Sequence, residues 1–124
     1  MNQLIAIAAG GATGALLRFG ASNAVHWALG RGFPYGTLFV NVTGSLAMGF
    51  LYYWLIERSV AQPALRGFVL IGLLGAFTTF SSFSIETLNL MEAGQWSRAV
   101  INMVASVLLC VGAAALGLLA GRQL

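Results

Sequence analysis

The stretch Gly75-Ala76-Phe77-Thr78-Thr79-Phe80-Ser81-Ser82-Phe83-Ser84 lies within an apolar run, yet it contains five hydroxyl side chains and three phenylalanines. If the run crosses a bilayer, no water is available at mid-depth, so each hydroxyl needs a partner within the protein or a polar ligand. Phe80 and Phe83 lie on one side of any helix that they share. Because the edge of a phenyl ring carries partial positive charge, it can face an anion. The stretch therefore predicts a path for a small anion past ring edges and hydroxyls.

The composition around this stretch is that of an integral membrane protein. Of the 124 residues, 59% are hydrophobic and 7% are charged, whereas roughly a quarter of the residues of a soluble domain are charged. Six arginines and three glutamates are spread thinly along the chain and give a net charge of +3. Such scatter does not form the dense basic patch that nucleic acid binding needs, so we expect no nucleic acid partner.

Four segments are long and apolar enough to cross a bilayer, which takes about 20 residues of helix. They are residues 4–28, 36–56, 67–85 or a little beyond, and 99–120. Because the connecting loops are short, we predict an all-α membrane protein in which residues 1–124 form a single four-helix transmembrane domain. We expect a multi-pass protein of the cell inner (plasma) membrane, surrounded by the lipid bilayer.

The first two spans carry polar residues that need an explanation. Arg18 lies deep in the first helix, so it either snorkels to an interface, draws anions into a vestibule or fixes a buried loop. In the second span Thr37, Asn41 and Ser45 share one face. The Asn41 amide must either hydrogen-bond across helices or line a polar path, and we predict the path. We assign Thr37 to the same anion path.

Glycines and hydroxyl residues weaken regular helix near residues 75–79 of the third span. A break at membrane depth is tolerated where it is buried in protein or lines a cavity, and freed carbonyls can coordinate a cation. The alternative is a continuous helix whose Ser and Thr side chains bond to their own backbone. We predict the break, and we assign Ser81 to the anion path. We expect Glu86 near the far interface, in a capping or pairing role rather than a transport role.

The fourth span carries one polar stripe, because Asn102, Ser106 and Cys110 are spaced four residues apart in an otherwise apolar helix. The stripe is either a hydrophilic track or a set of contacts between helices. We assign Asn102 and Ser106 to the candidate anion path. Cys110 taken alone fits a small apolar filler.

The arginines do not favour one orientation in the membrane, since three lie on one side and two on the other, with Arg18 near the second group. Arginines in short loops set topology, so the chain can insert both ways round. Four short helices also enclose little interior for so many polar groups. We therefore expect a homodimer, for which dual insertion permits an antiparallel arrangement.

Three blocks of the sequence resemble the signature blocks of the Fluc (CrcB-type) fluoride channels. They are Gly10-Gly11-Ala12-Thr13-Gly14-Ala15-Leu16-Leu17-Arg18-Phe19, then Gly36-Thr37-Leu38-x-Val40-Asn41-x-x-Gly44-Ser45, then the stretch at 75–84. The likeness extends over essentially the whole chain. It implies a dual-topology antiparallel homodimer with two narrow pathways, which exports fluoride passively and so gives fluoride resistance.

The resemblance also implies roles for individual residues. Phe80 and Phe83 correspond to phenylalanines whose ring edges contact fluoride, and Asn41 corresponds to the pore asparagine. The backbone carbonyls of Gly75 and Thr78 correspond to the ligands of a central structural sodium ion (Na+), one pair from each subunit.

A polar track on the family's fourth helix aligns with Asn102, Ser106 and Cys110. Asn102 and Cys110 stand where the family resemblance leads us to expect hydroxyl residues.

Passive fluoride conduction is the leading hypothesis, and each alternative has a distinguishing feature. A small multidrug-type antiporter depends on a glutamate within its first helix, but no acidic residue precedes Glu57. A fluoride/proton antiporter would have Glu86 as its one plausible proton carrier. A structural membrane subunit would use every polar residue to join helices. We do not expect an enzyme, because the sequence offers no nucleophile with its base and no set of metal-ligating side chains.

Overall fold

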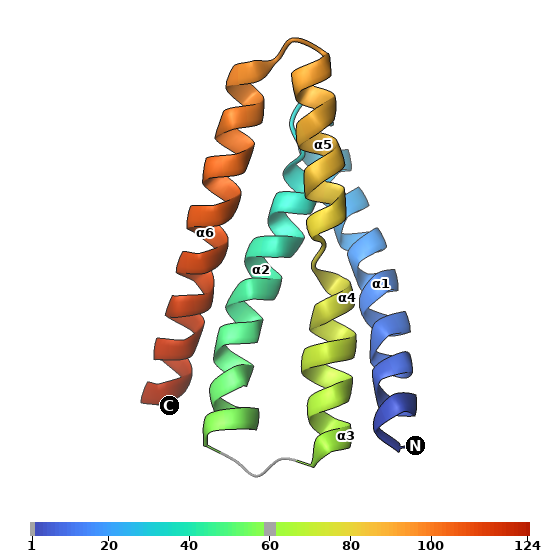
Figure 1. Ribbon diagram of the computed structural model, residues 1–124, viewed down its shortest axis with the longest axis vertical. Helices are drawn as coiled ribbons and strands as arrows, with labels where there is room; N and C mark the ends of the chain where they lie inside the picture. The colour runs from blue at the N-terminus through green and yellow to red at the C-terminus, as the bar shows by residue number, and fades with distance from the viewer. Residues whose placement is uncertain (1, 59–61) are drawn as a thin grey trace.

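The computed structural model describes residues 2–58 and 62–124, and the secondary structure of these residues is helical (Figure 1). The helices are α1 (Asn2–Leu29), α2 (Tyr35–Tyr52), η1 (Tyr53–Glu57), α3 (Pro63–Arg66), η2 (Gly67–Leu74), α4 (Gly75–Phe77), α5 (Phe80–Glu92) and α6 (Trp96–Gln123). The π-helical η1 continues α2, and the π-helical η2 joins α3 to α4. In the described part of the chain, four helical segments are long and apolar enough to span a membrane, Asn2–Leu29, Tyr35–Glu57, Pro63–Glu92 and Trp96–Gln123. This confirms the prediction of an all-α protein with four long apolar helices.

The four segments run up and down, so that both termini lie at the same end of the molecule (Figure 1). α2 packs against both α1 and α6, while α1 packs against η2 and α4. Gly10 and Gly14 of α1 allow the close contact between α1 and η2. A Cβ added at Gly10 would meet the Phe68 carbonyl oxygen, and one added at Gly14 would meet the Leu73 carbonyl oxygen. Small residues four apart are a common device for close helix contact in membranes.

Prolines and glycines mark where the helices begin and end. Pro63 is the first residue of α3, where the missing N–H would have no helical partner. Pro34 is the N-cap of α2. Gly30 and Gly94 have positive φ angles of 85° and 77°, which glycine adopts without the Cβ penalty, and they follow α1 and α5.

The third segment changes conformation between α4 and α5 (Figure 1). Thr78 has φ −91° and ψ 158°, and Thr79 has φ −153° and ψ 119°, so both residues are extended. A helical backbone resumes at Phe80. This connection lies beside α2, which contacts both α4 and α5.

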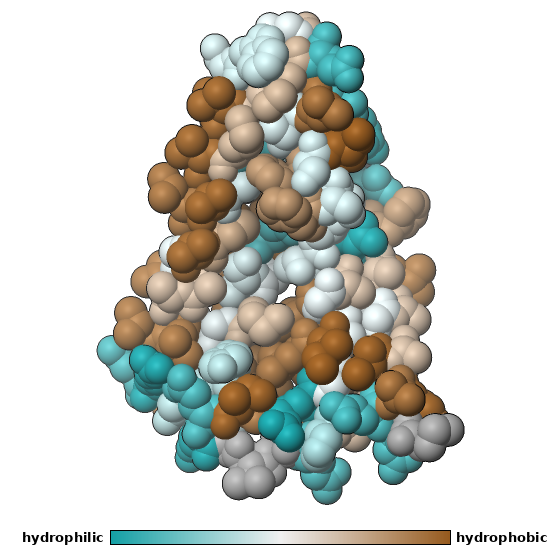
Figure 2. Space-filling view, viewed as in Figure 1, coloured by the Kyte–Doolittle hydropathy of each residue, from teal (hydrophilic) through white to brown (hydrophobic). Residues whose placement is uncertain are grey.

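Much of the apolar surface of the single chain is exposed. Hydrophobic residues gather along the outer side of α6, and hydrophilic residues gather at the lower end of the molecule (Figure 2). The exposed apolar residues of α6 include Val100, Ile101, Val104, Val107, Leu108, Leu109, Val111, Leu116 and Leu119. A surface of this kind belongs in contact with lipid or with another protein chain.

Candidate functional site

The two extended threonines between α4 and α5 are held by short-range bonds. The Thr78 hydroxyl donates to the Leu74 carbonyl at 3.1 Å, which closes the end of α4. The Thr79 hydroxyl accepts from the Ser82 backbone N–H at 3.2 Å and so caps the N-terminus of α5. Ser81 is exposed, with its Oγ atom 3.1 Å from Oγ1 of Thr79.

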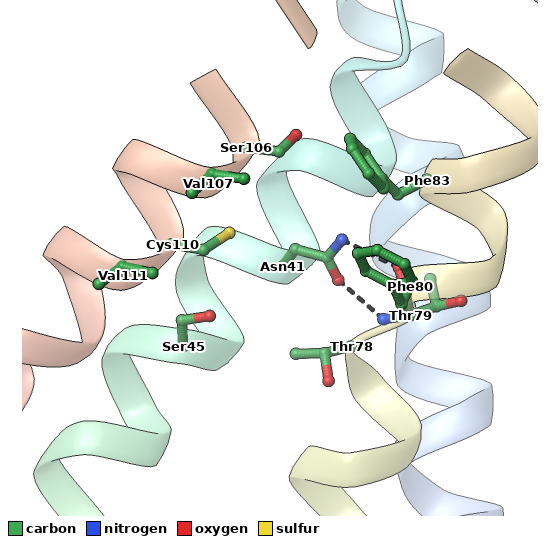
Figure 3. Close-up of a pocket in the computed structure, with 10 residues that line it drawn as sticks. All are labelled: Asn41, Ser45, Thr78, Thr79, Phe80, Phe83, Ser106, Val107, Cys110 and Val111. Atoms are coloured by element: carbon green, nitrogen blue, oxygen red, sulfur yellow. Dashed lines mark hydrogen bonds between the residues drawn. The ribbon is translucent and has the colours of Figure 1, made fainter. Parts of the chain in front are cut away.

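Asn41 pairs with the backbone of Thr79 through two hydrogen bonds (Figure 3). Its Nδ2 donates to the Thr79 carbonyl at 3.0 Å, and its Oδ1 accepts from the Thr79 N–H at 2.8 Å. Both backbone groups of a residue that has left the helix are therefore satisfied, which matters where water is excluded. The amide keeps one further N–H and one further lone pair for another partner.

Phe80, Phe83 and Asn41 meet in one cavity of about 280 Å³, which we call the phenylalanine cavity. Its full lining is Asn41, Ser45, Thr78, Thr79, Phe80, Phe83, Ser106, Val107, Cys110 and Val111. Figure 3 shows both rings on the side of α5 that faces α2 and α6. The ring centroids are 5.3 Å apart at an interplanar angle of 44°. Phe80 is 77% exposed in the single chain, so the cavity is open on that side.

A second cavity, of about 170 Å³, shares Thr79 with the phenylalanine cavity, because this residue lines both. We call it the arginine cavity, because Arg18 and Arg31 are among its lining residues, which are Arg18, Ser22, Asn23, His26, Arg31, Thr37, Val40, Thr79, Ser82 and Glu86. Thr37, assigned to the anion path together with Asn41, is buried and lines this second cavity. The sequence reasoning missed Ser82 as a lining residue, although it occurs in the opening stretch.

Arg18 contacts the end of α4. Its Nε donates to the Ala76 carbonyl at 3.0 Å. Of the three roles considered for Arg18, this bond fits the fixing of a buried segment. The position of Arg18 in the arginine cavity also fits the attraction of an anion. Glu86 lines the same cavity, and its Oε1 is buried with no hydrogen-bond donor among the described residues.

The carbonyls of Gly75 and Thr78 lose their usual helical donors. In a continuous helix the Gly75 carbonyl accepts from the N–H of Thr79, but that N–H is donated to Asn41. The Thr78 carbonyl would accept from the N–H of Ser82, which is donated to the Thr79 hydroxyl instead. Two backbone oxygens are thus available for a hard cation, which prefers oxygen ligands. No cluster of His, Cys, Asp or Glu suited to a metal occurs among residues 2–58 and 62–124.

The polar stripe of α6 faces α5 and the phenylalanine cavity. Asn102 donates to Oγ1 of Thr87 at 2.9 Å, and Ser106 donates to Oδ1 of Asn102 at 3.5 Å. Ser106 and Cys110 line the phenylalanine cavity, and Asn102 lies outside its lining. Thr87 was missed by the sequence reasoning, although its place one turn after Phe83 in the same helix was a usable signal.

Known proteins resemble this chain along almost all of its length. The family described as "CrcB-like protein, Camphor Resistance (CrcB)" matches residues 5–118. A protein of Magnetococcus marinus named "Fluoride-specific ion channel FluC" is 58% identical over 120 residues, which cover 97% of this chain and 98% of the relative. Proteins of the same name from Coxiella burnetii and Aeromonas salmonicida are 50% and 43% identical, and these matches cover 100% and 95% of this chain and 100% and 94% of the relatives.

These relatives, each named as an ion channel, confirm the predicted resemblance and the prediction that the chain is not an enzyme. Together with the four long apolar helices, they also confirm a multi-pass protein of the cell inner membrane. The chain belongs to the CrcB-like family.

Proposed function

We propose that this protein is a passive channel selective for fluoride, which exports the ion across the cell membrane and so confers fluoride resistance. The observation that carries the proposal is the meeting of Phe80, Phe83 and Asn41 in one cavity beside the extended threonines. The names of the relatives point to the same ion.

The phenylalanine cavity offers a small anion partners that are weak enough to release it. The ring edges of Phe80 and Phe83 carry partial positive charge, and the second N–H of the Asn41 amide remains as a donor. Ser106 adds a hydroxyl from α6, whose proton would turn from Oδ1 of Asn102, 3.5 Å away, to the ion. Donors that replace hydration water in a narrow path favour the smallest halide, while the absence of a full positive charge from the lining lets the ion leave.

The arginine cavity serves in this proposal as a vestibule. Arg18 and Arg31 raise the local anion concentration, and Thr37 and Ser82 supply hydroxyls along its wall. Thr79 lines both cavities, so the ion would pass from the arginine cavity to the phenylalanine cavity beside the Thr79 hydroxyl or beside the exposed Ser81.

The functional unit we propose is an antiparallel, dual-topology homodimer with two pores. The high exposure of Phe80 supports it, because a second copy would close the open side of the phenylalanine cavity. The extended break in the third span is part of the same proposal. The carbonyls of Gly75 and Thr78 would hold a central structural sodium ion together with the same pair from the partner, and this ion would fix the two subunits relative to each other.

A proton-coupled antiporter is the rival function. Its carrier would be Glu86, which lines the arginine cavity but not the phenylalanine cavity. A carrier that exchanges its proton for the ion must lie on the path of both. Glu86 meets this condition only in the proposed vestibule, outside the cavity that holds the two rings, so the flux itself decides: independence of fluoride flux from a pH gradient would support a channel.

The test is efflux from proteoliposomes, followed with a fluoride electrode and a chloride electrode. Wild-type protein should release fluoride and retain chloride. Phe80→Ile and Phe83→Ile should each lower fluoride efflux sharply, because isoleucine keeps the apolar bulk but has no polarised ring edge. Phe19→Ile is the matched control, since Phe19 is also exposed but lies on α1 outside both cavities. Wild-type efflux in both ring variants would falsify the role of the rings.

A further inference from the structure

We propose that Asn102 is a positioning residue, which holds α5 against α6 through Thr87 and so fixes the location of Phe83 in the phenylalanine cavity. The inference rests on the proposed function as a fluoride channel. It assigns Asn102 a task that is distinct from contact with the ion.

The α5 helix has irregular segments at both ends and buries little of its own surface against the bundle. Extended residues precede it, and a turn at residues 93–95 follows it. Among the residues of α5, all of which the structure describes, Thr87 is the one that is buried, at 5% exposure. The side chain that α5 buries against the rest of the protein therefore carries a hydroxyl and is not purely apolar.

The partner of this hydroxyl is Asn102, which is 2% exposed and donates from Nδ2 to Oγ1 of Thr87 at 2.9 Å. Thr87 in turn donates its single hydroxyl proton to the Phe83 carbonyl at 2.7 Å. The directions are consistent, because a hydroxyl that has spent its proton still has lone pairs to accept from the amide. Asn102 is held from its other side by Ser106, at 3.5 Å.

A chain of bonds thus runs from α6 to the backbone of Phe83. Thr87 lies four residues, or about 6 Å along the axis, after Phe83. Any slide or rotation of α5 that breaks the bond to Asn102 also moves the Phe83 ring relative to Ser106 and Cys110 across the cavity. Asn102 does not line the cavity itself, so its influence on the ion acts through this chain.

The experiment uses the single cysteine of the chain as a reporter. Cys110 lines the phenylalanine cavity, so the rate at which a small thiol reagent modifies it depends on how the rings of α5 cover it. We would measure this rate and the fluoride efflux rate for wild-type protein, Asn102→Ala, Thr87→Val, Thr87→Ser and the double variant Asn102→Ala/Thr87→Val. Asn89→Ala is the control, since Asn89 is an exposed amide on the same helix.

Asn102→Ala and Thr87→Val should each raise the labelling rate and lower efflux, by about tenfold for the loss of one buried bond. The double variant should be no worse than Asn102→Ala alone, because both substitutions remove the bond between Asn102 and Thr87, and Asn102→Ala removes in addition the longer bond from Ser106. Thr87→Ser keeps the hydroxyl and should behave like wild type, as should Asn89→Ala. This rescue separates positioning from a general loss of packing.

The proposal is overturned if Thr87→Val labels and conducts like wild type, or if the two substitutions are additive, because Asn102 would then act on the ion directly. If Asn102→Ala yields no folded protein, the near-isosteric pair Thr87→Val and Thr87→Ser decides alone. Wild-type protein that conducts no fluoride would refute the proposed function, while the labelling rates would still decide whether Asn102 positions α5.

Discussion

Replacement of Asn41 by leucine tests whether this side chain holds the connection between α4 and α5. Leucine has the same branched arrangement of side-chain heavy atoms as asparagine but no polar atoms, so both bonds to the Thr79 backbone are lost. Hydrogen bonds between helices in membrane proteins contribute about 0.6 kcal/mol on average and about 1.7 kcal/mol at most. Two of them amount to about 1–3 kcal/mol, which shifts the equilibrium between the ordered and the open connection by about 5- to 150-fold.

The assay is hydrogen exchange in lipid nanodiscs, read by mass spectrometry for peptides that contain Thr79. In Asn41→Leu the exchange of these peptides should accelerate by the factor above, because the Thr79 N–H loses its acceptor. Fluoride efflux should fall in the same variant, since Phe80 follows Thr79 directly. Peptides from α6 should exchange at the wild-type rate and serve as the internal reference, and Asn89→Leu is the matched control.

Unchanged exchange at Thr79 in Asn41→Leu would refute the reasoning. If efflux were lost while exchange stayed the same, Asn41 would act on the ion alone and the paired hydrogen bonds would have no positional role. If exchange rose while efflux stayed the same, the extended connection would have no bearing on conduction.

Three further outcomes follow from the contacts of the described residues. Gly14→Val should prevent folding, because the added Cβ would meet the Leu73 carbonyl oxygen, and the protein should aggregate on size exclusion in detergent. Gly11→Val should remain monodisperse, because no atom lies within 4 Å of a Cβ at this position. Arg18→Gln should lower fluoride efflux about tenfold or more, since it removes a vestibule charge and the bond to the Ala76 carbonyl, and a wild-type rate would contradict both roles. Replacement of sodium by N-methylglucamine during purification should weaken the proposed dimer, measured by subunit exchange between labelled batches, and equal exchange in both buffers would argue against the proposed structural sodium ion.

The helical spans were predictable from the sequence because hydropathy reports directly on the cost of placing side chains in lipid. The predicted limits fall short of the observed ones. The first span extends from Asn2 to Leu29 and the fourth from Trp96 to Gln123, since polar and aromatic residues continue a helix into the interface without adding to its apolar length. The π-helical winding of η1 and η2 had no signal in the pattern of residues.

The partners of the polar residues were much harder to predict than the spans. Asn41 and Thr79 are 38 residues apart, and nothing in either local sequence specifies that the amide pairs with that backbone. The shared face of Thr37 and Asn41 followed from their spacing, yet Asn41 lines the phenylalanine cavity and Thr37 lines the arginine cavity. Thr87 escaped notice because a single threonine in a helix usually bonds to its own backbone, and its second bond, to Asn102, depends on the packing of α5 on α6.

Each of the other three spanning segments contributes one polar side chain to the segment that carries the phenylalanines. Arg18 of α1 binds the Ala76 carbonyl, Asn41 of α2 binds the Thr79 backbone, and Asn102 of α6 binds the Thr87 hydroxyl. These bonds satisfy groups that lipid would leave unpaired, so a substitution at any of the three disturbs the segment before any ion arrives.

A loss of fluoride efflux alone therefore does not identify a residue that touches the ion. A change in selectivity does identify such a residue. A residue that coordinates fluoride contributes to the difference between the fluoride and chloride efflux rates, whereas a residue that holds the segment lowers both rates through the same geometry. The ratio of fluoride to chloride efflux should accordingly change in Phe80→Ile and Phe83→Ile. It should stay closer to the wild-type ratio in Asn102→Ala, which displaces Phe83 but removes no side chain from the lining of the path.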